Sequence, residues 1–430
     1  MRHWFSDLVA FRRDPLAFFL DRGSRAGSPL ERLSMGPGEV FLVCDPQLVR
    51  QILKAPTADI DKGKLIQKLS AVIGRSSMTL SGEAHAARRR VLHHQLARGL
   101  AAGYVPQISA LIRRQAAALA HETGFDAHHA TARLTLRVIC TILFGAGALT
   151  QADENLLIEA IQEVEDDLAA DMFRVLPHLP WVARAKAVKM RAARDKMGIV
   201  VTRARTRAGE SSLLAALEAL DLSDSEIADE VLLLLLAGHH TTGSAAAWVL
   251  HHLAQDPELC DEIAEEAEAV SDSAGEPLAA RLPAATKSQA LVREVLRLYP
   301  SSWWMSREVQ RPLELGGQKL KQGASLLISP WHLHRDPRFW EHPERFEPAR
   351  QHNGPAYIPF GSGPRACVAM GVGLLELQLV ALEFASAYLI SSAGGPVDRP
   401  RPSITLIPPA LPLRLAPRLK STPMNRAWAT

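Results

Sequence analysis

The spacing of hydrophobic and polar positions near the start of the chain predicts short strands followed by a helix. Residues 30–44 place two apolar stretches on either side of Gly36-Pro37-Gly38, a combination typical of two strands joined by a tight turn. Asp45-Pro46 predicts the start of a helix that runs to about Leu53, because aspartate caps a helix and proline fits its first turn. Residues 55–80 show no clean periodicity.

The middle of the chain has a helical pattern. From about residue 106 to residue 208 the sequence contains few glycines and predicts long helices, interrupted at Pro177, Pro180 and Trp181. Such a break suits a gate, and it equally suits a plain connection between helices. Alternation returns at residues 323–329 and 404–407, which predicts further small strands.

Two further helices have clear signals. Ser223-Asp224-Ser225-Glu226 is a capping box, and the helix it starts is predicted to run to about Gln255, where Asp256-Pro257 stops it. The second helix follows Cys367 and covers residues 371–387. It is apolar enough to be buried, with Leu374, Leu375, Leu377, Leu379, Val380 and Leu382.

Composition limits the classes of protein that fit. The chain has 430 residues and a net charge of +3, which is too small to argue for nucleic-acid binding. Four cysteines lie far apart without a CxxC pair, so neither a zinc site nor a disulfide framework is indicated, and a reducing compartment fits. Charged residues interrupt the apolar positions of residues 1–23, and the aliphatic run 231–237 is too short to cross a bilayer. We therefore expect a cytoplasmic protein with no membrane span.

The segment from Phe360 to Cys367 carries the strongest chemical signal. Gly361 and Gly363 allow a tight turn and a close approach to a flat molecule, and Arg365 supplies a cation suited to a carboxylate. Cys367 comes just before the apolar helix, whose positive N-terminal end favours a thiolate. A thiolate, a close flat surface and a carboxylate-binding arginine together suit haem held by an axial cysteine.

Taken alone, Cys367 fits better as a small buried hydrophobe, which is what most free cysteines are. The pattern Phe-Gly-x-Gly-x-Arg-x-Cys, however, resembles the haem-binding loop of the cytochrome P450 family. This resemblance implies haem b (iron protoporphyrin IX) with Cys367 as the iron ligand and Phe360, Gly361, Gly363 and Arg365 as cofactor-binding residues. The chain departs from the family at Ala369, where glycine is usual; the added methyl group would tighten the face of the haem next to the cysteine.

The predicted helix 223–255 contains Ala237-Gly238-His239-His240-Thr241-Thr242. Glycine and paired threonines are poor helix formers, so they indicate either close helix packing or a groove at a functional site. The segment resembles the oxygen-activation motif of the same family, which implies catalytic roles for Gly238, His240 and Thr241. His240 replaces the usual acid, as in the sterol demethylase branch. With an unperturbed pKa of ~6.5 it could relay protons, or it could hydrogen-bond a structural partner.

Further motifs follow the family's order. His85 and Arg89 are four residues apart in a basic stretch, which indicates either a solvated helix face or, by the resemblance, ligands of a haem propionate. The resemblance gives Arg307 the same role, and it leaves the other arginines of this stretch for a basic face toward an electron donor. Glu294 and Arg297, three apart on an apolar helix, resemble two members of the family's structural triad, and Arg345 is predicted as the third.

By the same resemblance, residues 55–80 are predicted to form a mobile loop that covers a substrate pocket. Apolar residues from several segments are predicted to line that pocket. Ordinary core packing is the competing interpretation for each of them, including the adjacent tryptophans. The predicted lining residues are Leu69, Ile73, Met78, Ala237, Ser302, Trp303, Trp304 and Pro409.

The resemblance covers about residues 29–415 and implies a mainly α fold with small β-sheets (α+β). We expect one domain over residues 1–430, with sheet regions in 29–80 and 310–420, helices in 81–300 and a frayed tail at 421–430. The implied activity is a haem-thiolate monooxygenase that uses dioxygen to oxidise a hydrophobic small molecule such as a fatty acid or terpenoid. Electrons would come from a separate ferredoxin or flavodoxin with its reductase. Alternatives are a haem-thiolate peroxygenase or isomerase that needs no redox partner, and a haem sensor.

Overall fold

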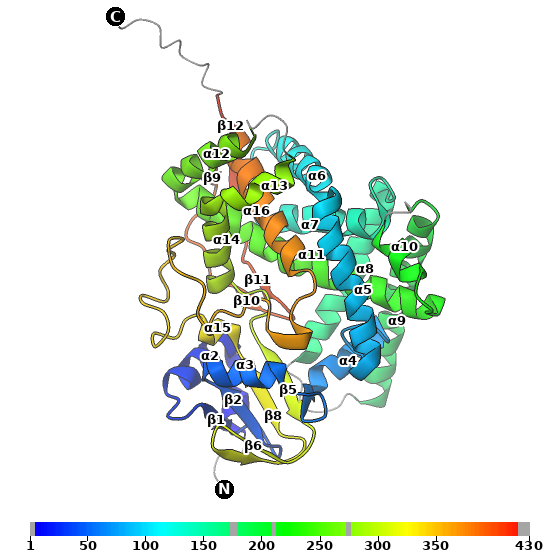
Figure 1. Ribbon diagram of the computed structural model, residues 1–430, viewed down its shortest axis with the longest axis vertical. Coiled ribbons are helices and arrows are strands. Elements are labelled where there is room, and N and C mark those ends of the chain that lie inside the picture. The colour runs from blue at the N-terminus through cyan, green and yellow to red at the C-terminus, as the bar shows by residue number, and fades with distance from the viewer. Residues whose placement is uncertain (1–4, 173–178, 209–211, 272–276, 420–430) are drawn as a thin grey trace, which may run out of the picture.

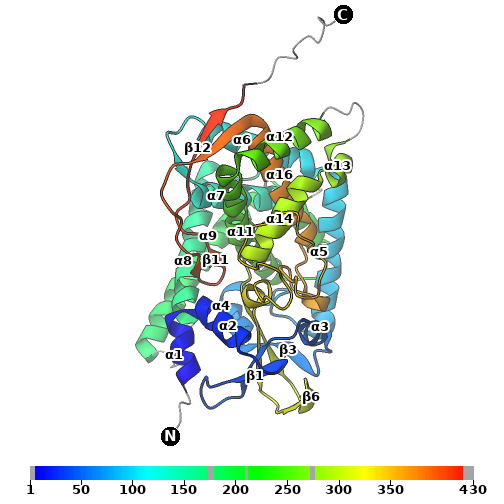
Figure 2. The same ribbon diagram turned by 90° about the vertical axis from the view of Figure 1, so that its left-hand side faces the viewer.

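A small β-sheet lies at one end of the molecule and helices form most of the rest (Figure 1). The computed structural model describes residues 5–172, 179–208, 212–271 and 277–419. The N-terminal helices lie beside the sheet, whereas the last strand lies at the opposite end (Figures 1 and 2). The chain therefore begins beside the sheet, passes through the helices, returns to the sheet and finishes among the helices.

The helices are named in chain order. The first eight are α1 (Ser6–Arg13), α2 (Pro15–Ser24), α3 (Pro46–Lys54), α4 (Lys64–Ile73), α5 (Gly82–Ala102), α6 (Tyr104–Leu119), α7 (Ala127–Phe144) and α8 (Gln151–Met172). The others are α9 (Pro180–Arg205), α10 (Leu213–Glu218), α11 (Asp224–Gln255), α12 (Pro257–Ser271), α13 (Leu278–Arg281), α14 (Thr286–Leu298), α15 (Pro330–Leu333) and α16 (Met370–Ala387). Two short 3₁₀ turns, η1 (Leu282–Ala284) and η2 (Gly363–Arg365), complete the helical elements of the described residues.

The main sheet combines strands from the two predicted β regions, 29–80 and 310–420, with β5, which lies outside both. Its order is β1-β2-β8-β5-β3, and β2 pairs with β8 in parallel while the other pairs are antiparallel. These strands are β1 (Leu30–Leu33), β2 (Val40–Val43), β3 (Ile60–Lys62), β5 (Met305–Val309) and β8 (Ser325–Ile328). Smaller sheets join β4 (Phe125–Asp126), β12 (Pro412–Pro417) and β9 (Tyr388–Ser392); β6 (Leu313–Leu315) and β7 (Gln318–Leu320); and β10 (Arg401–Pro402) and β11 (Leu406–Ile407).

Local sequence explains where the predicted helices begin. The Asp45 side chain accepts a hydrogen bond from the backbone N–H of Leu48, and Pro46 occupies the first turn of α3. The capping box at α11 is complete, because Ser223 and Glu226 each accept from the other's backbone N–H. The predicted ends of both helices are confirmed to within a residue or two.

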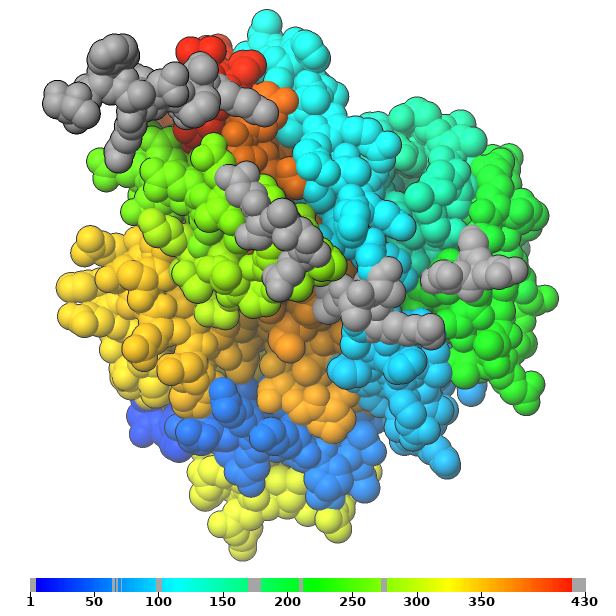
Figure 3. All heavy atoms as spheres, turned by 45° about the horizontal axis from the view of Figure 1, so that its top comes forward, coloured from blue at the N-terminus to red at the C-terminus, as the bar shows by residue number. Residues whose placement is uncertain are grey.

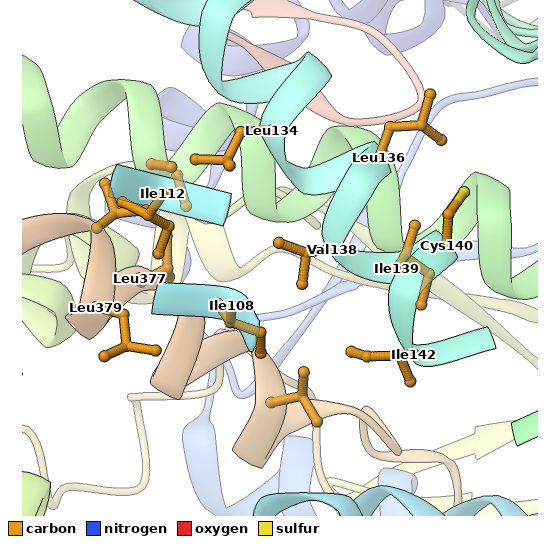
Figure 4. Packing of buried hydrophobic residues seen from close by; sticks show 14 of the residues in the cluster. Ile108, Ile112, Leu134, Leu136, Val138, Ile139, Cys140, Ile142, Leu377 and Leu379 are labelled. Carbon is orange, nitrogen blue, oxygen red and sulfur yellow. The ribbon is translucent and has the colours of Figure 1, made fainter. Parts of the chain in front are cut away.

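The core is built around α11, which packs against α7 on one side and α16 on another. Figure 4 shows how aliphatic side chains from three helices interlock there, including Ile108 and Ile112 of α6, Leu134 of α7, and Leu377 of α16. Ile108 and Ile112 are fully buried. This packing fixes α11 and α16 relative to each other, and these are the two helices that carry the oxygen-activation segment and follow the cysteine loop.

The predicted fold class, mainly α with small sheets, is confirmed. The strand pair around Gly36-Pro37-Gly38 is confirmed, and so are the strands near residues 323–329 and 404–407. The prediction of a loop throughout 55–80 was wrong, since β3 and α4 lie within it. Pro177 and the tail 421–430 lie outside the described residues.

One helix of the described part, α16, has the length and apolar composition that could cross a bilayer. It lies in the hydrophobic core, in contact with α6, α11, α12 and α14. These contacts identify α16 as a core helix of the fold.

Candidate active site

The cysteine loop is held in a compact turn immediately before α16. The backbone N–H of Cys367 donates to Phe360 O at 2.9 Å, and that of Ala366 donates to Gly363 O at 3.0 Å. Gly363 has φ +73°, and a Cβ atom there would lie 2.3 Å from Leu53 O at the end of α3. Only glycine fits this contact, so the loop is braced against α3. In Figure 3 this orange segment reaches the surface between α5 and the blue N-terminal elements.

Cys367 differs from the other cysteines in its surroundings. Its side chain is exposed, whereas Cys44, Cys140 and Cys260 are buried. Desolvation by the surrounding protein raises the pKa of Cys367, while a hydrogen bond from the Ala369 backbone and the charge of Arg89 act in the opposite direction. The expected lowering of this pKa by the helix N-terminus is thus outweighed in the protein alone. An iron ion would supply the missing stabilisation of the thiolate, because a coordinating thiol is deprotonated outright.

Four predicted cofactor-binding residues come together beside this loop. The Arg89 guanidinium donates to Ala366 O, and Arg307 donates to Ser306 O at 2.9 Å. Arg365 donates to Leu80 O at 2.9 Å and forms an ion pair with Asp61 at 3.2 Å. His85 is buried on α5, one turn before Arg89.

The charges in this cluster repel one another. Burial, followed by repulsion from Arg365 and Arg89, lowers the pKa of His85 to about 4. Burial, followed by repulsion from Arg365, lowers the pKa of Arg307 to about 10. Asp61 is the one carboxylate whose charge opposes the lowering of these two pKa values. A cluster of cations with so little compensating charge is suited to bind anions, and the two propionates of haem match that requirement.

The buried stretch of α11 is interrupted by an exposed opening at the predicted oxygen-activation segment. Ala237 is exposed although the residues before it, 231–235, are all buried. The Thr241 hydroxyl donates to Ala237 O at 2.7 Å, and the Ser301 hydroxyl donates to Thr241 O at 2.7 Å. Both contacts use backbone carbonyls of α11, so Thr241 is held at one edge of the exposed position.

Gly238 and His240 face away from this opening. A Cβ atom on Gly238 would lie 3.1 Å from Ile139 of α7, so the glycine permits close packing of two helices. His240 Nε2 lies 2.7 Å from Glu165 Oε2 of α8, and the His240 ring is buried. No sequence signal marks Glu165, because it lies in a different helix 75 residues earlier. The groove attributed to Gly238 stays a prediction.

The Glu294–Arg297 pair of the predicted structural triad is present, but the Arg345 side chain does not join it. Glu294 and Arg297 are fully buried and form two hydrogen bonds of 2.7 and 2.8 Å. The Arg345 side chain is exposed, and the residue contributes only its carbonyl oxygen, 3.0 Å from Arg297 Nη2. Arg350 reaches Glu294 at 3.5 Å and His352 reaches it at 2.8 Å. The assignment of Arg345 was therefore wrong, and Arg350 with His352 takes this place.

The predicted pocket residues divide into two groups. Trp303 was assigned wrongly: it is 0% exposed, donates from Nε1 to Ser403 O at 2.9 Å and packs in an aromatic cluster with Phe19 of α2. Trp304 packs on the same cluster and keeps some exposure. Ile73 is buried in the helical core. Roles in the pocket stay predictions for Trp304 and Ile73, and also for Leu69, Met78, Ala237, Ser302 and Pro409.

A buried charged network joins α11 to the segment before α5, residues 72–79. Arg88 is buried and pairs with Glu226 at 2.8 Å and Glu230 at 3.3 Å, so the expectation that it forms part of a basic surface was wrong. Glu230 also accepts from the Ser77 backbone N–H at 2.8 Å. Asp229, the neighbouring carboxylate, accepts from the Arg75 backbone N–H at 2.7 Å. The cover over the predicted pocket is thus bonded directly to the helix that carries Thr241.

Comparisons with known proteins agree with this geometry. The family model described as Cytochrome P450 matches residues 4–412. The chain is 29% identical to Cyclooctatin synthase and 29% identical to Cyclooctat-9-en-7-ol 5-monooxygenase, both from Streptomyces melanosporofaciens. These alignments cover 94% and 93% of this chain and 91% and 88% of the relatives. It is also 26% identical to Pentalenene oxygenase of Streptomyces avermitilis, over 94% of each chain.

A solved structure gives the same result. The crystal structure of CYP175A1 from Thermus thermophillus matches with a TM-score of 0.76 and 26% identity, over 96% of this chain and 98% of that one. The chain belongs to the cytochrome P450 family. It is a cytochrome P450 monooxygenase, so its cofactor is haem, and the monooxygenases of this family need dioxygen and a redox partner.

Proposed function

We propose that this cytochrome P450 hydroxylates an apolar terpenoid-like molecule, with electrons from a separate ferredoxin or flavodoxin and its reductase. The exposed Cys367 beside a cluster of poorly compensated cations is the observation that carries the haem site. The named activities of the relatives, a cyclooctat-9-en-7-ol monooxygenase and a pentalenene oxygenase, support the substrate class. A cytoplasmic location is part of the proposal.

Each part of the site has a task in this proposal. Cys367 would bind the haem iron, and His85, Arg89, Arg307 and Arg365 would hold the propionates. When bound, haem supplies the activation of dioxygen and the transfer of one oxygen atom to the substrate. Thr241 orients a hydrogen bond at the exposed position of α11, next to Ala237. The predicted lining residues Leu69, Ile73 and Met78 would exclude water from the reacting groups.

Proton supply is assigned to the pair formed by His240 and Glu165. Their 2.7 Å contact allows a proton to be held at Nε2 and passed between the two side chains. His128 of α7 lies beside them, with ring centroids 6.1 Å apart from His240. His240 therefore takes the place of the family's usual acid, and the carboxylate partner comes from α8.

The decisive experiment compares electron sources in purified protein reconstituted with haem. Terpenoids are first screened for ligands that shift the ferric haem spectrum, and the best ligands are then tested for turnover. Product with NADPH and a surrogate ferredoxin system, but not with peroxide alone, is expected. Product with peroxide alone would favour the peroxygenase, and ligand-induced spectral shifts without product under either condition would favour a haem sensor.

Replacing Thr241 with alanine is expected to lower product formation about tenfold, the equivalent of one lost hydrogen bond of about 1.4 kcal/mol. Electrons from NADPH should then appear as hydrogen peroxide instead. Thr241→Ser, which keeps the hydroxyl, is expected to retain most coupling, and Thr242→Ala serves as the neighbouring control. Equal ratios of product to peroxide in wild type and Thr241→Ala would contradict the assignment.

Replacing His240 with phenylalanine is expected to slow product formation and raise the solvent isotope effect on turnover. His240→Gln keeps a hydrogen bond to Glu165 but does not carry a proton, so the two variants should behave alike if relay is the role. Near-normal turnover in His240→Gln would show that the histidine is structural. His251→Gln, a buried histidine farther along α11, is the matched control.

A further inference from the structure

Helix α9 presents apolar side chains to solvent on its first half. Trp181 is 68% exposed and Val188 is 63% exposed. They are seven residues apart, so they lie on the same side of the helix, and the exposed Ala185 and Ala192 continue this line. We call this set of Trp181, Ala185, Val188 and Ala192 the outer stripe. Leu179, which precedes the helix, is 54% exposed.

The outer stripe is distinct from the face by which α9 joins the core. That inner face consists of Met190, Ala193, Met197, Val200, Val201 and Ala204, all buried. A surface helix ordinarily has one apolar stripe, facing the core, with polar residues opposite. Within the described part of the chain no packing contact accounts for the second stripe, and α9 runs along the outside of the molecule (Figure 2).

Cations flank the outer stripe on both sides. Arg184 and Arg191 lie along one edge and Lys189 along the other, and all three are exposed. Within the described residues they form no ion pair with an acidic side chain, whereas Lys196, farther along α9, pairs with Glu159 and Glu163 of α8. No acidic residue occurs in 179–194, and Asp195 ends the basic segment.

We infer that this face of α9 docks on the surface of a bilayer containing anionic phospholipids. Apolar side chains in line, a tryptophan at one end and exposed Lys and Arg on both flanks are the features of a helix that lies in a membrane interface. The apolar stripe would enter the headgroup region, and the three cations would contact lipid phosphates. This docking is peripheral, since no part of α9 would cross the bilayer.

A second copy of this chain fits the face less well. A twofold contact would bring the same cations together across the interface, and like charges at close range oppose association. An anionic bilayer instead offers compensating charge across the whole face. The membrane would also hold an apolar substrate at high local concentration; that consequence rests on the proposed function, whereas the docking itself does not.

The test is co-flotation of the haem-reconstituted protein with vesicles. Wild type is expected to float with vesicles of phosphatidylglycerol and phosphatidylcholine at equal ratio, and to remain behind with phosphatidylcholine alone or at high salt. The double variant Trp181→Ser/Val188→Ser and the triple variant Arg184→Gln/Lys189→Gln/Arg191→Gln should each lower the partition coefficient at least tenfold. Leu389→Ser, at an exposed apolar position on β9, is the matched control and should bind as wild type does.

The results of this experiment distinguish an anionic bilayer from a second copy of the chain at this face of α9. Equal binding of wild type and both stripe variants, or no binding of wild type to anionic vesicles, would overturn the inference. Dimers in solution that the stripe variants abolish would show that a second copy covers this face instead. The carbon monoxide spectrum reports the haem site independently, so a protein that binds vesicles without that spectrum contradicts the proposed function and leaves the docking intact.

Discussion

Replacing Cys367 with alanine is expected to abolish the carbon monoxide spectrum of a thiolate-ligated haem and all monooxygenase activity. The loop brings this one exposed cysteine to the start of α16, and the carbonyl of Phe360 and the backbone N–H of Ala369 fix its position. Alanine keeps the backbone hydrogen bond to Phe360 and removes the sulfur, together with the contact that the sulfur accepts from Ala369. The spectrum of reduced, carbon monoxide-treated protein is the direct measurement.

The control for this variant is Cys260→Ala, which removes a buried thiol far along the chain. It should leave the spectrum unchanged. A thiolate-type spectrum in Cys367→Ala would show that another residue binds the iron. Loss of the spectrum in both variants would instead indicate a general loss of folding, which thermal unfolding of the haem-free proteins distinguishes.

Replacing Glu294 with alanine is expected to lower the free energy of unfolding by about 3–5 kcal/mol, the usual cost of leaving a buried charge without its partner. Arg297 would lose both of its side-chain hydrogen bonds to this carboxylate while its guanidinium stays buried. Denaturant unfolding measures the effect, and retention of haem after gel filtration shows whether the site survives.

Two arginine variants test which arginine side chain pairs with Glu294. Arg345→Ala should change the free energy of unfolding by no more than about 0.5 kcal/mol, because its side chain is exposed. Arg350→Ala should cost more, because its guanidinium lies against Glu294 and pairs with Glu347 at 2.8 Å. A larger loss of unfolding free energy in Arg345→Ala than in Arg350→Ala would contradict the pairing of Arg350 with Glu294.

The Glu294 carboxylate makes the stability of the fold depend on pH. Burial raises the pKa of Glu294, but hydrogen bonds from Arg297 and His352 outweigh that effect and hold it at about 2. Its folded pKa lies below the unfolded value, so its contribution to stability is present above the unfolded pKa and is lost as the pH falls toward 2. The Glu294→Gln variant should therefore unfold with less dependence on acid than wild type.

Sequence was sufficient where a local rule decides the structure. The capping box of α11, the Asp45-Pro46 start of α3 and the glycines of the cysteine loop each satisfy a requirement of nearby backbone. Prediction from the sequence failed where the structure depends on contacts between segments that lie far apart in the chain. Arg345 and Arg350 both follow prolines in a loop, and only the tertiary structure determines which of them points toward Glu294.

The other errors have the same origin. Trp303 is adjacent to residues that border the predicted pocket, but the strand it precedes turns its ring toward α2, where Phe19 packs on it. Glu165 could not be found, because nothing in α8 marks the one acidic residue among several that meets His240. Burial of a polar residue against a partner far along the chain has no periodic signature.

The hydrogen bonds that Glu230 accepts from Ser77 and Asp229 accepts from Arg75 have a consequence for engineering this enzyme. Residues 72–79 cannot be exchanged as an independent module, because their backbone is anchored to the same helix that positions the Thr241 hydroxyl. A redesign that reshapes this segment for a new substrate would also disturb the helix that carries Thr241, whose hydroxyl is proposed to handle oxygen. Among variants redesigned in this segment, substrate selectivity and the efficient use of reducing equivalents should therefore change together.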